Sequence, residues 1–129
     1  MGVQKSVSPQ FNIEVECNYS ETESRPDENL FYFIYTVRIK NSGNTTAQLL
    51  NRHWIITDAL GRIEEVRGPG VVGMQPHIKP GQSFSYDSAC PLKTSSGSMK
   101  GSYEMTSENG DSFKLEIPEF FLISPQALH

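Results

Sequence analysis

The clearest pattern in the sequence is the alternation of apolar and polar residues over short segments. Residues 11–19 alternate without a break, with Phe11, Ile13, Val15, Cys17 and Tyr19 on one side and polar residues on the other. Successive side chains of a strand point to opposite faces, so this period of two predicts a strand with one buried and one solvated face. Further β-rich segments cover residues 30–40, 47–57, 62–67, 84–86, 97–106 and 113–117, and a short apolar piece covers residues 120–123.

The segment at residues 30–40 departs from simple alternation in its first half. Phe31, Phe33 and Tyr35 continue one apolar stripe, but Tyr32 and Ile34 add apolar character to the opposite face. A strand that is apolar on both faces is covered on both sides or lies at an interface. We therefore expect the surface carrying Tyr32 and Ile34 to meet a partner or a second copy of the chain.

Turn signals separate these segments, and no window shows a helical period. Asn41 to Asn44, Asp58 to Gly61, Pro80-Gly81 and Asn109-Gly110 have the composition of turns and hairpin loops. The sequence thus predicts an all-β protein, an immunoglobulin or fibronectin type III-like antiparallel β-sandwich of seven to eight strands, with a small barrel as the competing architecture. We expect a disordered tail over residues 1–10, a single domain over residues 11–125, and Trp54 in the core.

Length and charge exclude several classes of partner. A chain of 129 residues fits one domain, and its formal net charge of -4 opposes binding to nucleic acid or to an anionic membrane surface. The sequence has no run long enough to span a bilayer and no secretory pattern at its first residues. Two cysteines, Cys17 and Cys90, fit buried thiols of a reducing compartment, so we expect a cytoplasmic protein.

The segment at residues 66–81 is the best candidate site, because it holds four of the ten glycines, three prolines and no acidic residue. Its Gly-x-Gly-x-x-Gly spacing occurs in dinucleotide-binding proteins, but there a helix follows, and here Gln75-Pro76 and Pro80 prevent one. Exposed amides of such a loop can still hold a phosphate without a helix. The candidate ligand-binding residues for pyrophosphate or a nucleotide polyphosphate are Arg67, Gly68, Gly70, Gly73, His77 and Lys79.

Two other interpretations of this segment remain open. The glycines and prolines can simply shape a long crossover between strands. Alternatively, Val71 and Val72 form an exposed apolar tip that docks a protein partner or a second copy of the chain, together with Tyr32 and Ile34.

Neither a catalytic set nor a metal site is predicted. His53, His77, Cys17 and Cys90 lie on separate segments without the paired spacing of closed metal sites. No serine or cysteine lies in a known nucleophile motif, and the glutamates follow the ordinary pattern of a solvated sheet surface. We expect no enzyme activity, no catalytic residues and no cofactor.

Several segments, taken in order, resemble the ApaG family, also called CorD: residues 51–58, 66–73, 97–103 and 117–120, with the Gln75-Pro76 and Pro80-Gly81 pairs. The resemblance extends from residue 11 to residue 123. It implies a fibronectin type III-like sandwich, free-standing in bacteria and fused to other modules in eukaryotes, with a loose link to cobalt resistance and magnesium efflux and a frequent gene neighbourhood with a diadenosine tetraphosphatase. Met74 stands where relatives often carry glutamate, and Ala89 where they carry glycine.

Together these observations predict a non-enzymatic binding module that recognises a protein partner through its glycine-rich loop. A sensor of pyrophosphate or a nucleotide polyphosphate at the same loop is the alternative. A homodimer, formed through a strand edge or through the surface at Leu30 to Ile34, is a further possibility that the pattern leaves open.

Overall fold

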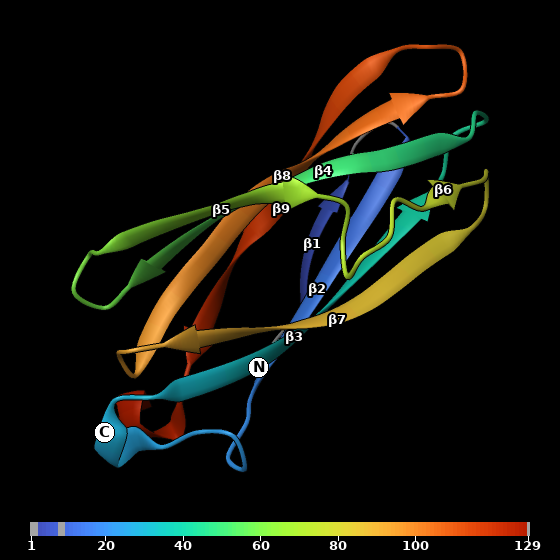
Figure 1. Ribbon diagram of the computed structural model, residues 1–129. Helices are drawn as coiled ribbons and strands as arrows, with labels where there is room; N and C mark the ends of the chain where they lie inside the picture. Colours follow the sequence, from blue (N-terminus) through green and yellow to red (C-terminus); the bar gives the residue numbers. More distant parts are fainter. Residues whose placement is uncertain (1–2, 8–9, 129) are drawn as a thin grey trace.

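The computed structural model describes residues 3–7 and 10–128, whose strands form two antiparallel sheets packed face to face (Figure 1). The first sheet has the strand order β1-β2-β3-β7, with β1 at Val3–Val7, β2 at Phe11–Tyr19, β3 at Phe31–Asn41 and β7 at Ser83–Leu92. The second has the order β5-β4-β8-β9, with β4 at Ala47–Asp58, β5 at Ile63–Pro69, β8 at Ser96–Ser107 and β9 at Ser112–Ile123.

Three short elements complete the described chain. Strand β6, at His77–Ile78, pairs with the start of β4. The two 3-10 helices are η1 at Pro26–Glu28 and η2 at Pro125–Leu128. None of the helices in the part of the chain that the structure describes has the length and hydropathy of a membrane-spanning segment.

The predicted all-β sandwich is confirmed, but the described residues form nine strands where the sequence predicts seven to eight, because β1 and β6 are not predicted. The larger difference is at the N-terminus. Val3–Val7 form strand β1, antiparallel to β2, where the sequence predicts a disordered tail over residues 1–10. Without this partner, the outer edge of β2 would present unpaired N–H and C=O groups, and β1 covers them. Residues 1, 2, 8 and 9 of the predicted tail lie outside the described residues.

The core lies between the sheets, and Trp54 is at its centre, as the sequence predicts. Its side chain is 3% exposed. The rings of Tyr35 and Phe120 meet it edge to face, at centroid distances of 5.5 Å and 5.9 Å. Such aromatic pairs stabilise a core beyond the effect of area burial alone. They join β3 of one sheet to β4 and β9 of the other, so the two layers cannot shift independently.

A β-bulge at Leu50 changes which face of β4 is buried. Leu49 lies opposite Met105 and Asn51 opposite Glu104, so Leu50 is one extra residue in the ladder with β8. Before the bulge the odd-numbered residues point inward, and after it Trp54 does. Residues 52, 54 and 56 therefore share the inner face.

The two apolar residues on the second face of β3 lie on the outer surface of the first sheet. Ile34 is 41% exposed and Tyr32 is partly exposed. Across the ladder, Ile34 faces Ala89 of β7 and Tyr32 faces Pro91. Ile34 is therefore open to solvent in the described chain, and an interface at this surface stays a prediction.

The buried side chain of Asn41 fastens the end of β3 to β6. Its Nδ2 donates to the carbonyl oxygens of Thr45 and Ile78, both at 2.8 Å, and its Oδ1 accepts from the N–H of Gly43 at 2.9 Å. Asn41 is 0% exposed, so water cannot replace these partners.

We predict that Asn41→Ala lowers the free energy of unfolding by about 2–4 kcal/mol, because it leaves two carbonyls and one N–H unpaired in a buried place. Urea unfolding followed by tryptophan fluorescence measures the change. Asn18→Ala is the matched control, since Asn18 is exposed on β2 and should shift stability by less than about 0.5 kcal/mol. Equal stability of the two variants would show that the Asn41 contacts are not needed.

Candidate functional site

The glycine-rich loop, residues 69–76, crosses the opening between the two sheets (Figure 1). Beneath it lies a cleft of about 420 Å³ between the free edges of β5 and β7. Strands β4 and β5 line the cleft with Arg52, Trp54, Ile56, Glu64 and Val66, and β3 and β7 line it with Tyr35, Tyr86, Ser88, Ala89, Cys90 and Pro91. Val71, Val72 and Gly73 of the loop close one end.

The bulge in β4 fixes this loop to the sheet. The carbonyl oxygen of Leu50 accepts two hydrogen bonds, from the N–H of Gly70 at 2.8 Å and from Nε2 of Gln75 at 2.9 Å. The N–H of Leu49 donates to the carbonyl of Pro76 at 3.0 Å. Both ends of the loop are thus bonded to adjacent residues of one strand, so the loop is a fixed structure.

The loop also closes on itself and places Val71 in the core. The N–H of Val71 donates to the carbonyl of Met74 at 2.8 Å, and the N–H of Met74 donates back to the carbonyl of Val71 at 2.9 Å. Val71 is 1% exposed, so its prediction as part of an exposed apolar tip is wrong. Burial of an apolar valine side chain is favourable, and the tight turn directs the side chain of Val71 into the core.

Gly70 is required by this turn for two reasons. Its φ of 62° lies in the left-handed region, and a Cβ at this position would clash with the carbonyl oxygen of Met74. Gly73 has a φ of 78° as well, but a Cβ there would meet nothing within 4 Å. There is therefore space for a side chain at position 73 but not at position 70.

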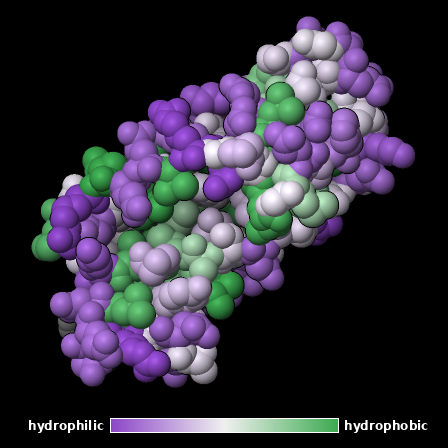
Figure 2. All heavy atoms as spheres, viewed as in Figure 1, coloured by the Kyte–Doolittle hydropathy of each residue, from purple (hydrophilic) through white to green (hydrophobic). Residues whose placement is uncertain are grey.

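The exposed tip of the loop consists of Val72 and Met74, which are 57% and 52% exposed. Val72 has a φ of 44°, a left-handed conformation that is strongly unfavourable for a β-branched residue. Figure 2 shows apolar residues gathered around the opening between β5 and β7, on the face where the loop crosses. An apolar side chain is thus held outward at the mouth of the cleft by a strained backbone.

Arg52 anchors the loop from within the cleft. Its Nη1 donates to the carbonyl oxygens of Pro69 at 3.0 Å and Gly70 at 3.1 Å. Its guanidinium covers Gly68, where a Cβ would come within 2.9–3.0 Å of Nη1, Cζ and Nη2. Gly68 therefore makes room for a flat cation. Within the described residues, no carboxylate oxygen lies within 4.0 Å of this guanidinium, and neither Nε nor Nη2 has a hydrogen-bond partner.

Three tyrosines line or adjoin the inner wall of the cleft. The hydroxyl of Tyr86 is hydrogen-bonded to that of Tyr103, and Tyr35 lies opposite Ser88 in the ladder between β3 and β7. Burial raises the pKa of all three phenols, and the positive charge of Arg52 lowers the pKa of Tyr35 and Tyr86 in part. At neutral pH these are uncharged hydroxyl groups beside a cation.

The two cysteines are free, buried thiols, as the sequence predicts. Burial raises the pKa of each of Cys17 and Cys90 to about 12. They lie on β2 and β7, with β3 between those strands, and two strand spacings of about 4.8 Å exceed the reach of a disulfide. A thiol with such a pKa is a poor nucleophile, so neither cysteine is a candidate for catalysis.

The six predicted ligand-binding residues do not converge on one place. Arg67 and Gly68 line a groove on the outer face of the second sheet, while Gly73 lines the cleft on its inner side. His77 lies exposed on β6 and Lys79 lies exposed just after it; neither lines the cleft or the groove. The N–H of Gly70 is bonded to Leu50, which removes it as a donor to a ligand.

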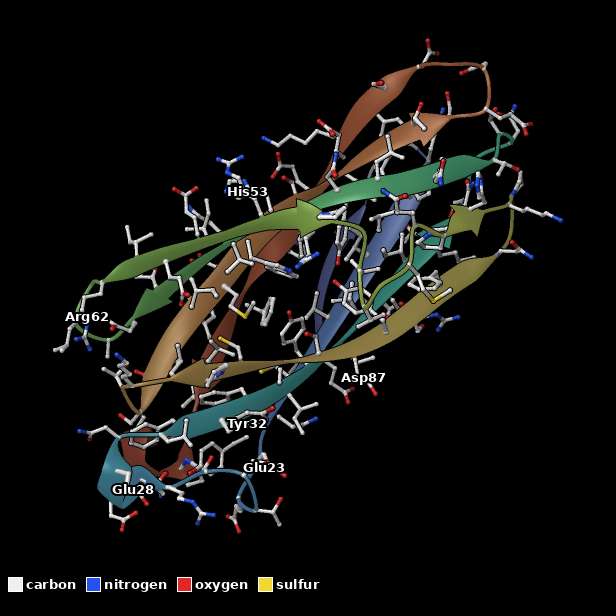
Figure 3. All side chains as sticks on the ribbon, in the orientation of Figure 1. Glu23, Glu28, Tyr32, His53, Arg62 and Asp87 are labelled. Carbon is white, nitrogen blue, oxygen red and sulfur yellow. The ribbon has the colours of Figure 1, made fainter. Side chains whose placement is uncertain are left out.

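The outer groove, of about 720 Å³, is lined by both polar and apolar residues, and it contains His53 on β4 (Figure 3). Nε2 of His53 lies 2.7 Å from Oε1 of Glu65, and Nη2 of Arg67 lies 3.5 Å from the same oxygen. His53 thus lies on the outer face of the second sheet, whereas the buried thiols belong to the first sheet, and His77 lies on β6 opposite Gln48. No group of three or more His, Cys, Asp or Glu side chains gathers in a metal-binding arrangement within the described residues.

Sequence reasoning missed Arg52, although a signal for it exists. Arg52 precedes Trp54 by two residues, so once Trp54 is placed in the core, alternation puts Arg52 on the same face. A charged residue in phase with a buried strand face calls for an explanation. The bulge at Leu50 hides this signal, because it breaks the phase set by Ala47 and Leu49.

Comparison with known proteins identifies clear relatives. A family model described as the ApaG domain matches residues 21–107. A protein of Bdellovibrio bacteriovorus named Protein ApaG is 59% identical over 127 residues, covering 98% of this chain and 100% of that protein. Another Protein ApaG, from Pseudomonas paraeruginosa, is 52% identical over 93% of this chain and 95% of its own. The crystal structure of a Bordetella pertussis protein titled ApaA is 46% identical, with a TM-score of 0.88 over 94% of this chain and 99% of that chain.

We predict that Gly70→Ala destabilises the protein by at least about 2 kcal/mol, because it adds a backbone clash to the cost of the left-handed conformation. Gly73→Ala is the control at the other end of the turn. It meets only the conformational cost, about 1–2 kcal/mol. Thermal and urea unfolding give the energies, and ¹⁵N–¹H spectra of Gly68 and Val71 report the loop. If Gly70→Ala is no less stable than Gly73→Ala, the turn does not hold the loop as described.

Proposed function

Since this chain belongs to the ApaG family, we propose that it is a non-enzymatic, cytoplasmic binding module that recognises a protein partner through the tip of its glycine-rich loop. The observation that supports this most directly is the conformation of Val72. A valine with a φ of 44° that is 57% exposed gains less from burial than a core valine and still carries strain. Backbone strain of this kind costs about 1–3 kcal/mol and persists where the surroundings enforce it, commonly at functional sites.

The fixed geometry of the loop favours binding. Leu50, Arg52 and Gln75 hold the loop through backbone carbonyls, so the tip loses little conformational entropy when a partner binds. Val72 and Met74 together offer an apolar contact beside a cleft whose lining includes the polar residues Arg52, Glu64 and Ser88. An apolar centre within a polar rim is the usual composition of a protein interface.

The apolar surface on β3 can extend this contact. Ala89 and Pro91 line the rim of the cleft, and across the ladder they face Ile34 and Tyr32 on the outer side of the first sheet. The edge of β7 therefore connects the two predicted partner-binding surfaces. A partner seated at Val72 would reach Ile34 by folding around this edge.

The cobalt and magnesium link that the family resemblance implies would then be indirect in this chain. The position after Gly73 is Met74, whose thioether extends the apolar tip and supplies no carboxylate to a hard cation.

We predict that a photo-crosslinking amino acid at position 72, introduced in the native host, yields one discrete adduct, because the tip contacts the partner. The same group at Glu108, an exposed position on the turn between β8 and β9, is the control and should give none. Mass spectrometry identifies the adduct, and a second copy of this chain would identify the partner as a homodimer. Matching patterns from positions 72 and 108 would contradict the proposal.

The adduct then allows a quantitative check. Val72→Asp should weaken binding of the purified partner at least tenfold, whereas Leu60→Asp should not change it, because Leu60 is exposed apolar surface on the turn between β4 and β5. Isothermal titration calorimetry measures both. An unchanged Kd for Val72→Asp would remove the tip from the interface.

One structural feature favours the second candidate function, the sensing of pyrophosphate or a nucleotide polyphosphate. Val72 and Gly73 are adjacent residues with positive φ, and within the described chain their N–H groups have no hydrogen-bond partner. Successive amides of this kind can form an anion-binding concavity. Arg67, however, lies on the other face of the sheet and is close to Glu65, so it adds no charge to this concavity.

If pyrophosphate binds at this loop, the amides of Val72 and Gly73 should shift in ¹⁵N–¹H spectra, while Arg67→Ala should leave the Kd unchanged. Calorimetric titration with pyrophosphate and with diadenosine tetraphosphate provides the affinity. A tenfold loss in Arg67→Ala would instead place the anion in the outer groove. Absence of any shift up to about 10 mM ligand would leave the protein partner as the function of the loop.

A further inference from the structure

The guanidinium of Arg52 is an unusual cation for the inside of a sandwich. It lies on the inner face of β4, and Arg52 lines both the cleft and the outer groove. The carboxylate of Glu64 lines the cleft too, but within the described residues no carboxylate oxygen lies within 4.0 Å of the guanidinium. Tyr35 and Tyr86 are uncharged at neutral pH, and within the described residues Arg52 has no ion pair. A partly buried charge without a counter-charge in direct contact favours an anion from outside.

The orientation of the guanidinium leaves its carboxylate-binding edge free. Both protein hydrogen bonds come from Nη1, which points to the loop carbonyls of Pro69 and Gly70. Nε–H and the adjacent Nη2–H remain unpaired in the described structure. These two donors are parallel, and together they match the two oxygens of a carboxylate.

The rest of the cleft is largely apolar or aromatic. Trp54, Ile56, Val66 and Met99 lie on the side of the second sheet, and Tyr35 lies opposite. The volume of about 420 Å³ is within the range of small-molecule sites, roughly 300–1,000 Å³. Such a lining would hold an apolar group while the charged end meets Arg52.

We propose that the cleft binds a carboxylate that is attached to an apolar or aromatic group, with Nε and Nη2 of Arg52 on the two carboxylate oxygens. Hydroxyl groups of Tyr35 and Ser88 lie in the same cleft and can supply a further hydrogen bond. The carboxylate can belong to a free small molecule or to the C-terminus of a peptide. This site would exist whether or not a protein binds the tip of the loop.

A ligand with a single negative charge fits the cleft better than a phosphate, which carries more. Arg52 is the one cation among the residues that line the cleft, and Glu64 lines the same space. Two or three negative charges would be opposed by Glu64 and by the net charge of -4. A carboxylate brings one charge, which one guanidinium balances.

The test compares each acid with its neutral amide. 3-Phenylpropanoate and an acetylated tripeptide with a free C-terminal phenylalanine are the two acids, and 3-phenylpropanamide and the tripeptide amide are their uncharged isosteres. ¹⁵N–¹H spectra and calorimetry of the full chain give site and affinity. We expect at least one acid to bind with a Kd of about 1 mM or below, and its amide to bind at least about tenfold more weakly.

Two variants locate the binding. Arg52→Gln removes the charge but keeps an amide that can donate to the loop carbonyls, and Ser88→Leu fills the cleft without changing any charge. Both should weaken the acid at least about tenfold, while the resonances of Gly70 and Gly73 show whether the loop remains in place. Arg67→Ala is the control, because Arg67 lies on the outer face of the sheet.

Each outcome either identifies the source of the carboxylate or overturns the proposal. Tighter binding of the tripeptide acid than of 3-phenylpropanoate assigns the site to a peptide terminus, and the reverse order assigns it to a small molecule. Equal affinity for acid and amide, an acid affinity unaltered in Arg52→Gln with a native loop, or no binding of either acid up to about 10 mM would each overturn the proposal. Stronger binding of inorganic phosphate than of both acids would overturn it as well.

Discussion

One extra residue in strand β4 sets the structure of the whole site. The bulge at Leu50 reverses the phase of the strand, so that Arg52 and Trp54 share the inner face. It also frees the carbonyl of Leu50 from the ladder, and this oxygen holds both Gly70 and Gln75. The position of the cation, the packing of the core tryptophan and the path of the loop therefore follow from a single irregularity in hydrogen bonding.

The loop is a rigid part of the fold, despite its glycine and proline content. Val71 is buried like a core residue, and Arg52 bonds to the backbone that surrounds it. The glycines are present because the turn is too tight for side chains, and this tightness is what holds Val72 outward. A binding surface on such a loop is formed before the partner arrives, which makes its shape, more than its adaptability, the source of selectivity.

Much of the fold could be predicted from the sequence, because alternation reports burial directly. Strand β2 begins and ends at the predicted residues, and Trp54 lies in the core as expected. The candidate site was harder to predict from the sequence than the fold. Nothing local shows that Leu50 is the extra residue of a bulge, since that depends on its pairing with β8. Val71 and Val72 are identical neighbours in the sequence, yet the hydrogen bonds of the turn bury one and expose the other.

The cleft remains open because the edges beside it do not join. Strands β5 and β7 are the free edges, and Pro69 ends the first while Pro91 lies within the second. Proline has no N–H to offer a neighbouring strand, so neither edge readily accepts the backbone of another molecule. These prolines therefore disfavour growth of the sheets into fibres at high concentration. They leave the space between the two sheets accessible to a ligand.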